Sequence, residues 1–186
     1  YRNGDKIPTD FRKFEWRRFH ITKIGAYATY NDDPGNADLC GYLYNFYTIK
    51  DDRGVCPEGW HVPTDKEWME LEIYLGMNKN KVKSSGLRGT NEGSQLASNN
   101  ELWQFGELVN ETEFGTSGFN ALPCGYREAD NGEYLRSGKF GSFWSSTTQS
   151  NNVPLVRYLF STAPEVYRST SRPWSGLSIR CIGDSD

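Results

Sequence analysis

Side chains that could act as nucleophiles or general bases are few in this chain of 186 residues. It has two histidines, His20 and His61, and two adjacent serines, Ser145 and Ser146, beside Trp144. A serine hydrolase commonly carries its nucleophile in a Gly-x-Ser-x-Gly turn, which is absent here, and neither histidine lies near the serines in sequence. His61 directly precedes an apolar residue and a proline, which favours a packed or capping role. The sequence therefore predicts no catalytic residues and no enzyme.

Four cysteines could hold a metal or form disulfides: Cys40, Cys56, Cys124 and Cys181. None is spaced as Cys-x-x-Cys, and only two histidines could complete a ligand set, so we expect no metal site. The acidic segment 31–36 lacks calcium-loop spacing and is typical of a turn. In an oxidising compartment one or two disulfides could form, with three possible full pairings, whereas a reducing compartment favours buried free thiols.

Composition and charge narrow the function classes further. No glycine-rich phosphate-binding loop is present, so neither a nucleotide nor another cofactor is expected. The net charge of −3 argues against nucleic acid as a partner. No apolar run approaches the roughly 20 residues that span a bilayer. No signal peptide is visible either, so localisation cannot be read from the N-terminus.

The elements that must position these residues are short. Aromatic residues make up 15% of the chain and hydrophobic residues only 36%, which indicates a core built from rings between many loops. The length suits one domain over residues 1–186. Residues 42–47 form an aromatic run that predicts a strand, and from residue 119 onward glycines and prolines separate further short strands. One good helix and a strand-rich C-terminal third predict an α+β fold.

The clearest helix follows Thr64. Thr64 and Glu67 match a capping box. Gly76 suits the left-handed residue that ends a helix. Three apolar side chains at positions i, i+3 and i+7 predict a buried stripe, namely Trp68, Leu71 and Leu75.

Several segments in order along the chain carry a family resemblance. They are 1–8, 43–47 (Leu-Tyr-Asn-Phe-Tyr), 59–65 (Gly-Trp-His-Val-Pro-Thr-Asp), 118–127 (Gly-Phe-Asn-Ala-Leu-Pro-Cys-Gly-Tyr-Arg), 143–147 (Phe-Trp-Ser-Ser-Thr) and 176–181 (Gly-Leu-Ser-Ile-Arg-Cys). In these the chain resembles the Fibrobacter succinogenes major paralogous domain family, which is widespread in Bacteroidetes and related bacteria. Its members are mostly surface or secreted proteins without an assigned activity.

The resemblance implies a C-type-lectin-like fold, of the variety shared with formylglycine-generating enzymes, with short twisted antiparallel strands, one or two helices and many loops. It implies that Trp144 packs in the core and that segment 176–181 closes the domain against its front half. The calcium-binding triplets of true C-type lectins are absent, as is a recognisable copper-binding cysteine pair. Cys124 departs from the family, which usually has glycine there, so no disulfide pairing is carried over.

The family also supplies many targets of diversity-generating retroelements, which mutate adenines in a C-terminal window. Here that window lies within the C-terminal third, 144–181. Segment 153–175 mixes apolar, aromatic and hydroxyl side chains without lysine, as recognition surfaces do. An ordinary hairpin that covers the core is the alternative. Three positions fit the family as framework: Arg157, Val166 and Arg168.

The sequence thus predicts a non-enzymatic binding module, of receptor or adhesin type, whose variable surface meets a protein or glycan ligand. We expect it outside the cell or at a cell surface, with display by a phage or virus as a variant. The rivals are a static structural or adhesin component of a bacterial surface and an oxidase of the formylglycine-generating type. The predicted ligand contacts are Leu155, Val156, Tyr158, Phe160, Tyr167, Ser169, Thr170, Ser171 and Trp174.

Overall fold

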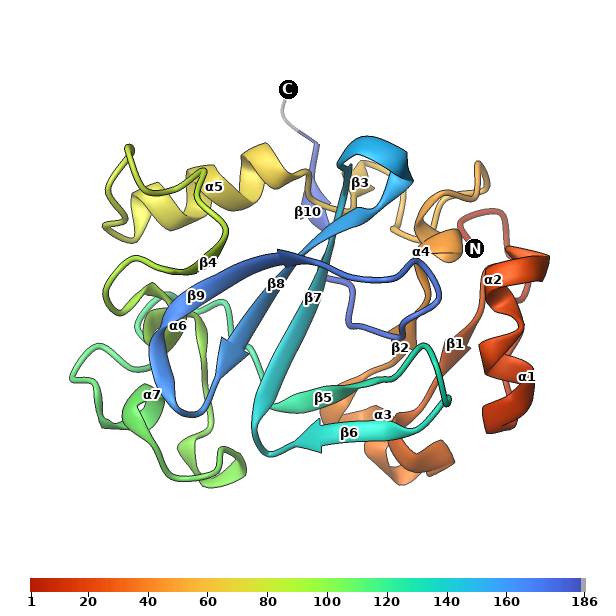
Figure 1. The fold of residues 1–186 in the computed structure, drawn as a ribbon, viewed down its shortest axis with the longest axis horizontal. Coiled ribbons are helices and arrows are strands. Elements are labelled where there is room, and N and C mark those ends of the chain that lie inside the picture. The colour runs from red at the N-terminus through yellow and green to blue at the C-terminus, as the bar shows by residue number, and fades with distance from the viewer. Residues whose placement is uncertain (185–186) are drawn as a thin grey trace.

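The computed structural model describes residues 1–184 and has an α+β architecture, which confirms the predicted class (Figure 1). Within these residues α5 (Asp65–Tyr74) is the one α-helix longer than six residues. The other helices are single turns or little more: α1 (Lys13–Arg17), α2 (Phe19–Thr22), α3 (Gly35–Cys40), α4 (Phe46–Ile49), α6 (Glu92–Leu96) and α7 (Glu107–Asn110), with 3-10 turns at Tyr30–Asp32, Asn100–Leu102 and Ser150–Asn152. The sequence patterns missed most of these short turns because each has too few residues to show a helical period.

An antiparallel sheet of four strands forms the centre of the molecule. Its order is β4 (Gly86–Arg88), β9 (Ala163–Thr170), β8 (Pro154–Phe160) and β7 (Phe140–Thr148). Three two-stranded sheets surround it: β1 (Tyr27–Ala28) with β2 (Leu43–Tyr44), β3 (Trp60–His61) with β10 (Ile182–Gly183), and β5 (Cys124–Arg127) with β6 (Tyr134–Ser137). The predicted strands after residue 119 are thereby confirmed.

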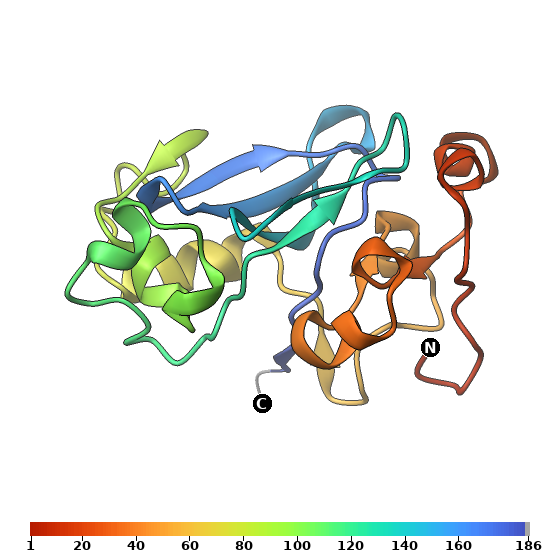
Figure 2. The ribbon, with the colours of Figure 1, turned by 90° about the horizontal axis from the view of Figure 1, so that it is seen from below.

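Helices α5, α6 and α7 lie on one side of the four-stranded sheet (Figure 2). The main core cluster lies between them and the sheet, and it includes Trp68, Phe143, Leu159 and Val166. α6 packs so closely on β9 that only a glycine fits at position 93. A Cβ atom added to Gly93 would lie 2.4 Å from the carbonyl oxygen of Glu165. The other side of the sheet is covered only in part, by the N-terminal third of the chain.

The start and end of α5 agree with the sequence prediction. The Thr64 side chain accepts a hydrogen bond from the Glu67 amide, and the Glu67 carboxylate accepts one from the Thr64 amide. Trp68 is buried, while Leu71 and Leu75 are partly buried against the same cluster. Gly76 follows the helix at a φ of 117°, a conformation that favours glycine.

The strand predicted for residues 42–47 is correct only at Leu43–Tyr44. The run is interrupted at Asn45, whose side-chain oxygen accepts hydrogen bonds from the amides of Thr48 and Ala26. This fully buried side chain therefore caps α4 and turns the chain out of the sheet.

Segment 176–181 closes the fold against the front half, as the resemblance implied. Leu177 and Tyr44 exchange two backbone hydrogen bonds, of 2.8 and 3.0 Å. Trp144 is fully buried, and its indole nitrogen donates to the Tyr44 carbonyl at 2.7 Å. Long-range main-chain pairing and one buried indole thus hold the two ends of the chain together.

The disulfide pairing, which the sequence left open, is Cys40–Cys124 and Cys56–Cys181. The two bridges join residues 84 and 125 positions apart. Each links the front half of the chain to its C-terminal half, so both reinforce the closure made by segment 176–181.

Candidate functional site

The side of the four-stranded sheet away from α5 carries a group of aromatic rings. In the strand register Tyr158 lies opposite Tyr167 on β9 and opposite Ser142 on β7. Phe160 lies opposite Phe140. Because side chains two apart on a strand share a face, rings from three strands meet here, and β5 adds one more. We call this group the aromatic face, and its members are Tyr126, Phe140, Tyr158, Phe160 and Tyr167.

The rings of the aromatic face contact one another in a continuous chain. The Phe140 and Phe160 centroids lie 4.4 Å apart, and those of Phe160 and Tyr167 lie 5.1 Å apart. Tyr158 stacks on Phe160 at 6.1 Å, and Tyr126 lies 6.2 Å from Phe140. All five side chains are partly exposed. They therefore form a preordered apolar surface that needs little further ordering to bind a ligand.

Two charged residues lie on or beside this surface: Glu165, which shares its side of β9 with Tyr167, and Arg136. Burial raises the pKa of Tyr158 to about 12, so its hydroxyl is neutral at physiological pH. The Arg136 guanidinium lies 5.5 Å from the centroid of the Phe140 ring. Among residues 1–184 no carboxylate pairs with Arg136. On β4, Leu87 lies opposite Tyr167 and is half exposed, which extends the apolar surface to the sheet edge.

Four of the nine predicted contact residues are partly exposed on this side of the sheet. Tyr158, Phe160 and Tyr167 are part of the aromatic face, and Ser169 follows Tyr167 two positions later on β9. Ser171 lies just beyond β9, where its hydroxyl donates to the Ser175 hydroxyl at 3.0 Å. The hydroxyl residues thus flank the rings at one end.

Two predicted contacts need correction. Leu155 is 3% exposed and Val156 is 0% exposed, so both are core residues that a ligand cannot reach. Val156 packs against Trp144 and Leu177 beneath the covered part of the sheet. A hydrophobic residue in a strand looks the same in sequence whether its face is open or covered. Val156 is covered by a cluster that includes Phe46 of the N-terminal third, whereas Leu155 points to the side that faces α5.

The last two predicted contacts lie elsewhere. Thr170 pairs with Leu155, which places it on the side that faces α5. Trp174 lies near the N-terminal helices: its ring centroid is 5.6 Å from that of His20, and its carbonyl accepts a hydrogen bond from the Trp16 indole. The structure does not bring either residue to the aromatic face.

Sequence reasoning missed two members of the surface, Tyr126 and Phe140. Both lie outside segment 153–175. The signal that could have found Phe140 is alternation along β7, where Phe140 and Ser142 share a face, but assigning that face requires the pairing with β8.

The opposite face of the same sheet carries a buried ion network, which the sequence also did not predict. Arg157 contacts Glu72 at 2.6 Å and Asp65 at 2.7 Å. Arg168 contacts Asp65 at 2.7 Å, and Arg88 contacts Glu72 at 2.8 Å. Arg157, Val166 and Arg168, which are expected to be framework residues, are all buried.

The residues considered first for catalysis do not assemble into a catalytic group. The Nδ1 atom of His61 lies 2.5 Å from Asp184, and its Nε2 atom lies 2.9 Å from Glu67, so both ring nitrogens are engaged. Ser145 is fully buried. Within residues 1–184 neither Ser145 nor Ser146 hydrogen-bonds a histidine. The same part of the chain shows no cluster of three metal-binding side chains and no helix with the length and apolar character to cross a bilayer.

Comparison with known protein families gives a match. The family model described as the Fibrobacter succinogenes major domain matches residues 1–183. None of the curated proteins and none of the solved structures matches the chain.

Proposed function

The chain belongs to the Fibrobacter succinogenes major domain family, and from this premise we propose that it is a ligand-binding module without enzymatic activity. Its ligand, a protein or a glycan, contacts the aromatic face. The observation that carries the proposal is the continuous chain of five partly exposed rings contributed by β5, β7, β8 and β9. Contiguous exposed apolar surface of this kind marks interaction sites, because it is unfavourable to leave in water.

The chemistry of the surface suits recognition. Rings present much contact area with few rotatable bonds, and the flanking Ser169 and Ser171 hydroxyls can adapt their hydrogen bonds. The face of a sugar ring and an apolar protein side chain both pack on such rings. The hydroxyls and Arg136 at the edge supply the polar contacts that give specificity.

We also propose that the protein lies outside the cell or at a cell surface. Its support is the pairing of all four cysteines in two disulfides, which persist in oxidising compartments. In this oxidised form none of the cysteines offers a thiolate, which also argues against an oxidase that works through a cysteine pair.

A more specific hypothesis is that the domain has a C-type-lectin-like fold and that a retroelement diversifies its C-terminal window. Its support is that buried and partly exposed residues alternate from Arg157 to Phe160 in β8 and from Val166 to Ser169 in β9, so some positions can vary while the framework stays constant. Tyr158, Phe160, Tyr167 and Ser169 are then the variable positions. Leu155 and Val156 belong to the constant part because they are buried.

Alanine substitution on the aromatic face tests the binding proposal. The wild-type protein is screened on an oligosaccharide array and against a peptide display library, and its best binder is titrated against the variants. Phe160→Ala and Tyr167→Ala should weaken binding at least tenfold while the far-ultraviolet circular dichroism stays unchanged. Tyr74→Ala and Phe105→Ala are matched controls, because these rings are 86% and 81% exposed and do not belong to the aromatic face.

Equal binding by all four variants contradicts the proposal. Unfolding of Phe160→Ala and Tyr167→Ala, with both controls folded, assigns the rings to the core and also contradicts it.

Sequencing the 3′ end of the gene across a population tests the retroelement reading. Substitutions concentrated at adenines of the codons for Tyr158, Phe160, Tyr167 and Ser169, with Trp144 constant, are the expected result. Uniform sequence there supports a static surface component instead.

A further inference from the structure

A second surface feature, a groove of about 350 Å³, lies on the other side of the molecule from the aromatic face. Its sides are β3, β10 and the first half of α5, and residues 118–119 close it. Since α5 packs on the sheet side opposite the aromatic face, the groove is a separate site. Its volume falls in the range of small-molecule pockets.

The walls of the groove are mainly aromatic and aliphatic. Trp68 and Leu71 of α5 line it together with Phe119, and Ile182 and Trp60 stand at its rim, 40% and 47% exposed. Trp60 and Ile182 thus leave apolar surface at the rim that a bound ligand would cover, which is favourable.

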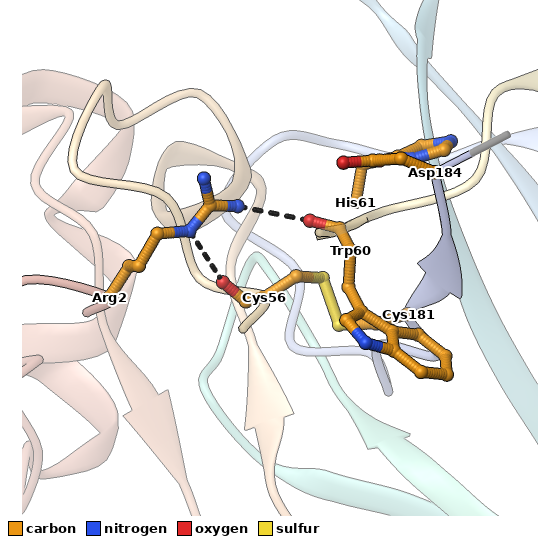
Figure 3. Close-up of a disulfide and its surroundings, with 6 residues drawn as sticks. All are labelled: Arg2, Cys56, Trp60, His61, Cys181 and Asp184. Carbon is orange, nitrogen blue, oxygen red and sulfur yellow. Dashed lines mark hydrogen bonds and ion pairs between the residues drawn. A yellow bond between two sulfur atoms is a disulfide. The ribbon is translucent and has the colours of Figure 1, made fainter. Parts of the chain in front are cut away.

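Two neighbours hold Trp60 in place (Figure 3). The Arg2 guanidinium donates to the carbonyl oxygens of Cys56 and Trp60, both at 3.0 Å. The Cys56–Cys181 disulfide anchors the chain on either side of the groove, and the Trp60 indole lies beside Cys181 (Figure 3). The rim is therefore built into the fold and needs no rearrangement to receive a ligand.

The two charged side chains that line the groove, Glu67 and Arg180, differ in how many hydrogen-bond and ion-pair partners they have within the protein. The Glu67 carboxylate already accepts hydrogen bonds from the amide and hydroxyl of Thr64, at 2.7 and 2.8 Å, and contacts His61 at 2.9 Å. Glu67 is thus neutralised locally and has little capacity left for a ligand cation.

Arg180 is the opposite case. Its guanidinium lies 4.8 Å from the centroid of the Phe119 ring and donates a hydrogen bond to the Asn120 carbonyl at 3.3 Å. Within residues 1–184 no carboxylate pairs with it. Partial desolvation lowers the pKa of Arg180, although its side chain is exposed at the edge of the groove. It retains donors in a fork that matches a carboxylate.

We propose that this groove is a second binding site, for a small apolar monocarboxylate. The ligand's ring or branched chain lies between Trp60, Phe119 and Ile182, and its carboxylate meets Arg180. The volume admits one ring with a short side chain, and the walls supply apolar contact. Arg180, which no carboxylate among residues 1–184 pairs with, selects a single negative charge. This proposal goes beyond the ligand proposed for the aromatic face.

The first test compares two ligands on the unmodified protein. 3-Phenylpropionate and its neutral amide, 3-phenylpropionamide, have the same ring and nearly the same size. Isothermal titration should show the carboxylate binding about tenfold or more tightly, because a hydrogen bond to a charged partner is worth that much or more. Equal affinities, or no binding of the carboxylate at millimolar concentration, overturn the proposal.

The second test compares variants. Arg180→Gln should weaken 3-phenylpropionate binding about tenfold and leave the amide unchanged, whereas Arg136→Gln, on the aromatic face, should change neither. Trp60→Ala should weaken both ligands equally. If Arg180→Gln and Arg136→Gln bind alike, the carboxylate does not meet Arg180 and the proposal fails.

The groove and the aromatic face can be judged separately. Phe160→Ala should bind 3-phenylpropionate as the wild type does. If this variant loses binding to the oligosaccharide or peptide ligand but still binds 3-phenylpropionate, the loss concerns only the function proposed for the aromatic face.

Discussion

The two faces of the four-stranded sheet are built from the same strands but have opposite chemistry. Beneath α5, Arg157 and Arg168 extend into a buried network with Asp65 and Glu72. On the other face the neighbouring residues of β8 and β9 present partly exposed rings. Because successive side chains point to opposite faces, adjacent residues such as Arg157 and Tyr158 serve different roles. The strand hairpin can therefore hold one face constant while the other face varies.

The buried face achieves specificity through charge. Each carboxylate meets two arginines: Asp65 contacts Arg157 and Arg168, and Glu72 contacts Arg88 and Arg157. Burial of charge is unfavourable by itself, and these contacts offset it only in part, because the Nε atom of Arg88 is buried without a hydrogen-bond partner among residues 1–184. Such a network fits only one position of α5 on the sheet, so it sets the helix register more than it adds stability.

Removing one partner of the network should have the largest effect. Glu72→Gln leaves Arg88 and Arg157 buried without their anion, and the expected loss is about 3–5 kcal/mol of unfolding free energy. Urea denaturation measures it. Glu70→Gln on the same helix is the matched control, since its pair with Lys66 is exposed, and it should lose less than about 1 kcal/mol. Similar losses in both variants would contradict the assigned role of the network.

Truncating the aromatic face should have a smaller effect on stability. A double-mutant cycle of Phe160→Ala and Tyr167→Ala should give a coupling energy of about 0.5–1.5 kcal/mol, the usual value for a ring pair. The same urea measurement applies. A coupling as large as the loss in Glu72→Gln would mean that this face is also core.

Lowering the pH should affect the stability contributed by the buried ion network but not that contributed by the aromatic face. Burial raises the pKa of Asp65, but hydrogen bonds and charge from Arg168 and Arg157 outweigh it, so the net pKa is lowered. A lowered folded-state pKa gives stability that is present above the unfolded value of about 3.9 and is lost as pH falls through the folded-state value. The unfolding free energy of Phe160→Ala should therefore fall in acid in parallel with the wild type, whereas Asp65→Asn should show a shallower fall. Parallel curves for Asp65→Asn and the wild type would be the contrary result.

The smallest effect is expected at His61, which lies on neither face. Hydrogen bonds with Asp184 and then Glu67 raise the pKa of His61. The stability from the raised pKa is fully present below the unfolded value of about 6.5 and is lost as pH rises through the folded-state value. Chemical denaturation at pH 5.5 and at pH 9 should show a small loss in the wild type that His61→Gln abolishes. His20→Gln, which removes a ring without an ion pair among residues 1–184, should retain the wild-type difference.

The sequence by itself determined the features that local pattern encodes. The capping box of Thr64 and Glu67 defines the start of α5. Glycines and prolines delimit the later strands. The family motifs were sufficient to place Trp144 in the core and segment 176–181 against the front half. Prediction succeeded there because each signal acts within a few residues or recurs in a known order. The prediction of one domain over the whole chain stays a prediction.

Only the tertiary structure decided which strand residues face a ligand and which are buried. Leu155, Val156 and Tyr158 belong to one apolar strand, yet the first two are core and the third joins the aromatic face. The pairing of Cys40 with Cys124, and the meeting of Glu72 with Arg88 and Arg157, were equally beyond local pattern. The physical reason is that strand register and helix position are set by contacts between residues far apart in the chain, and these contacts determine which alternate side chains are covered.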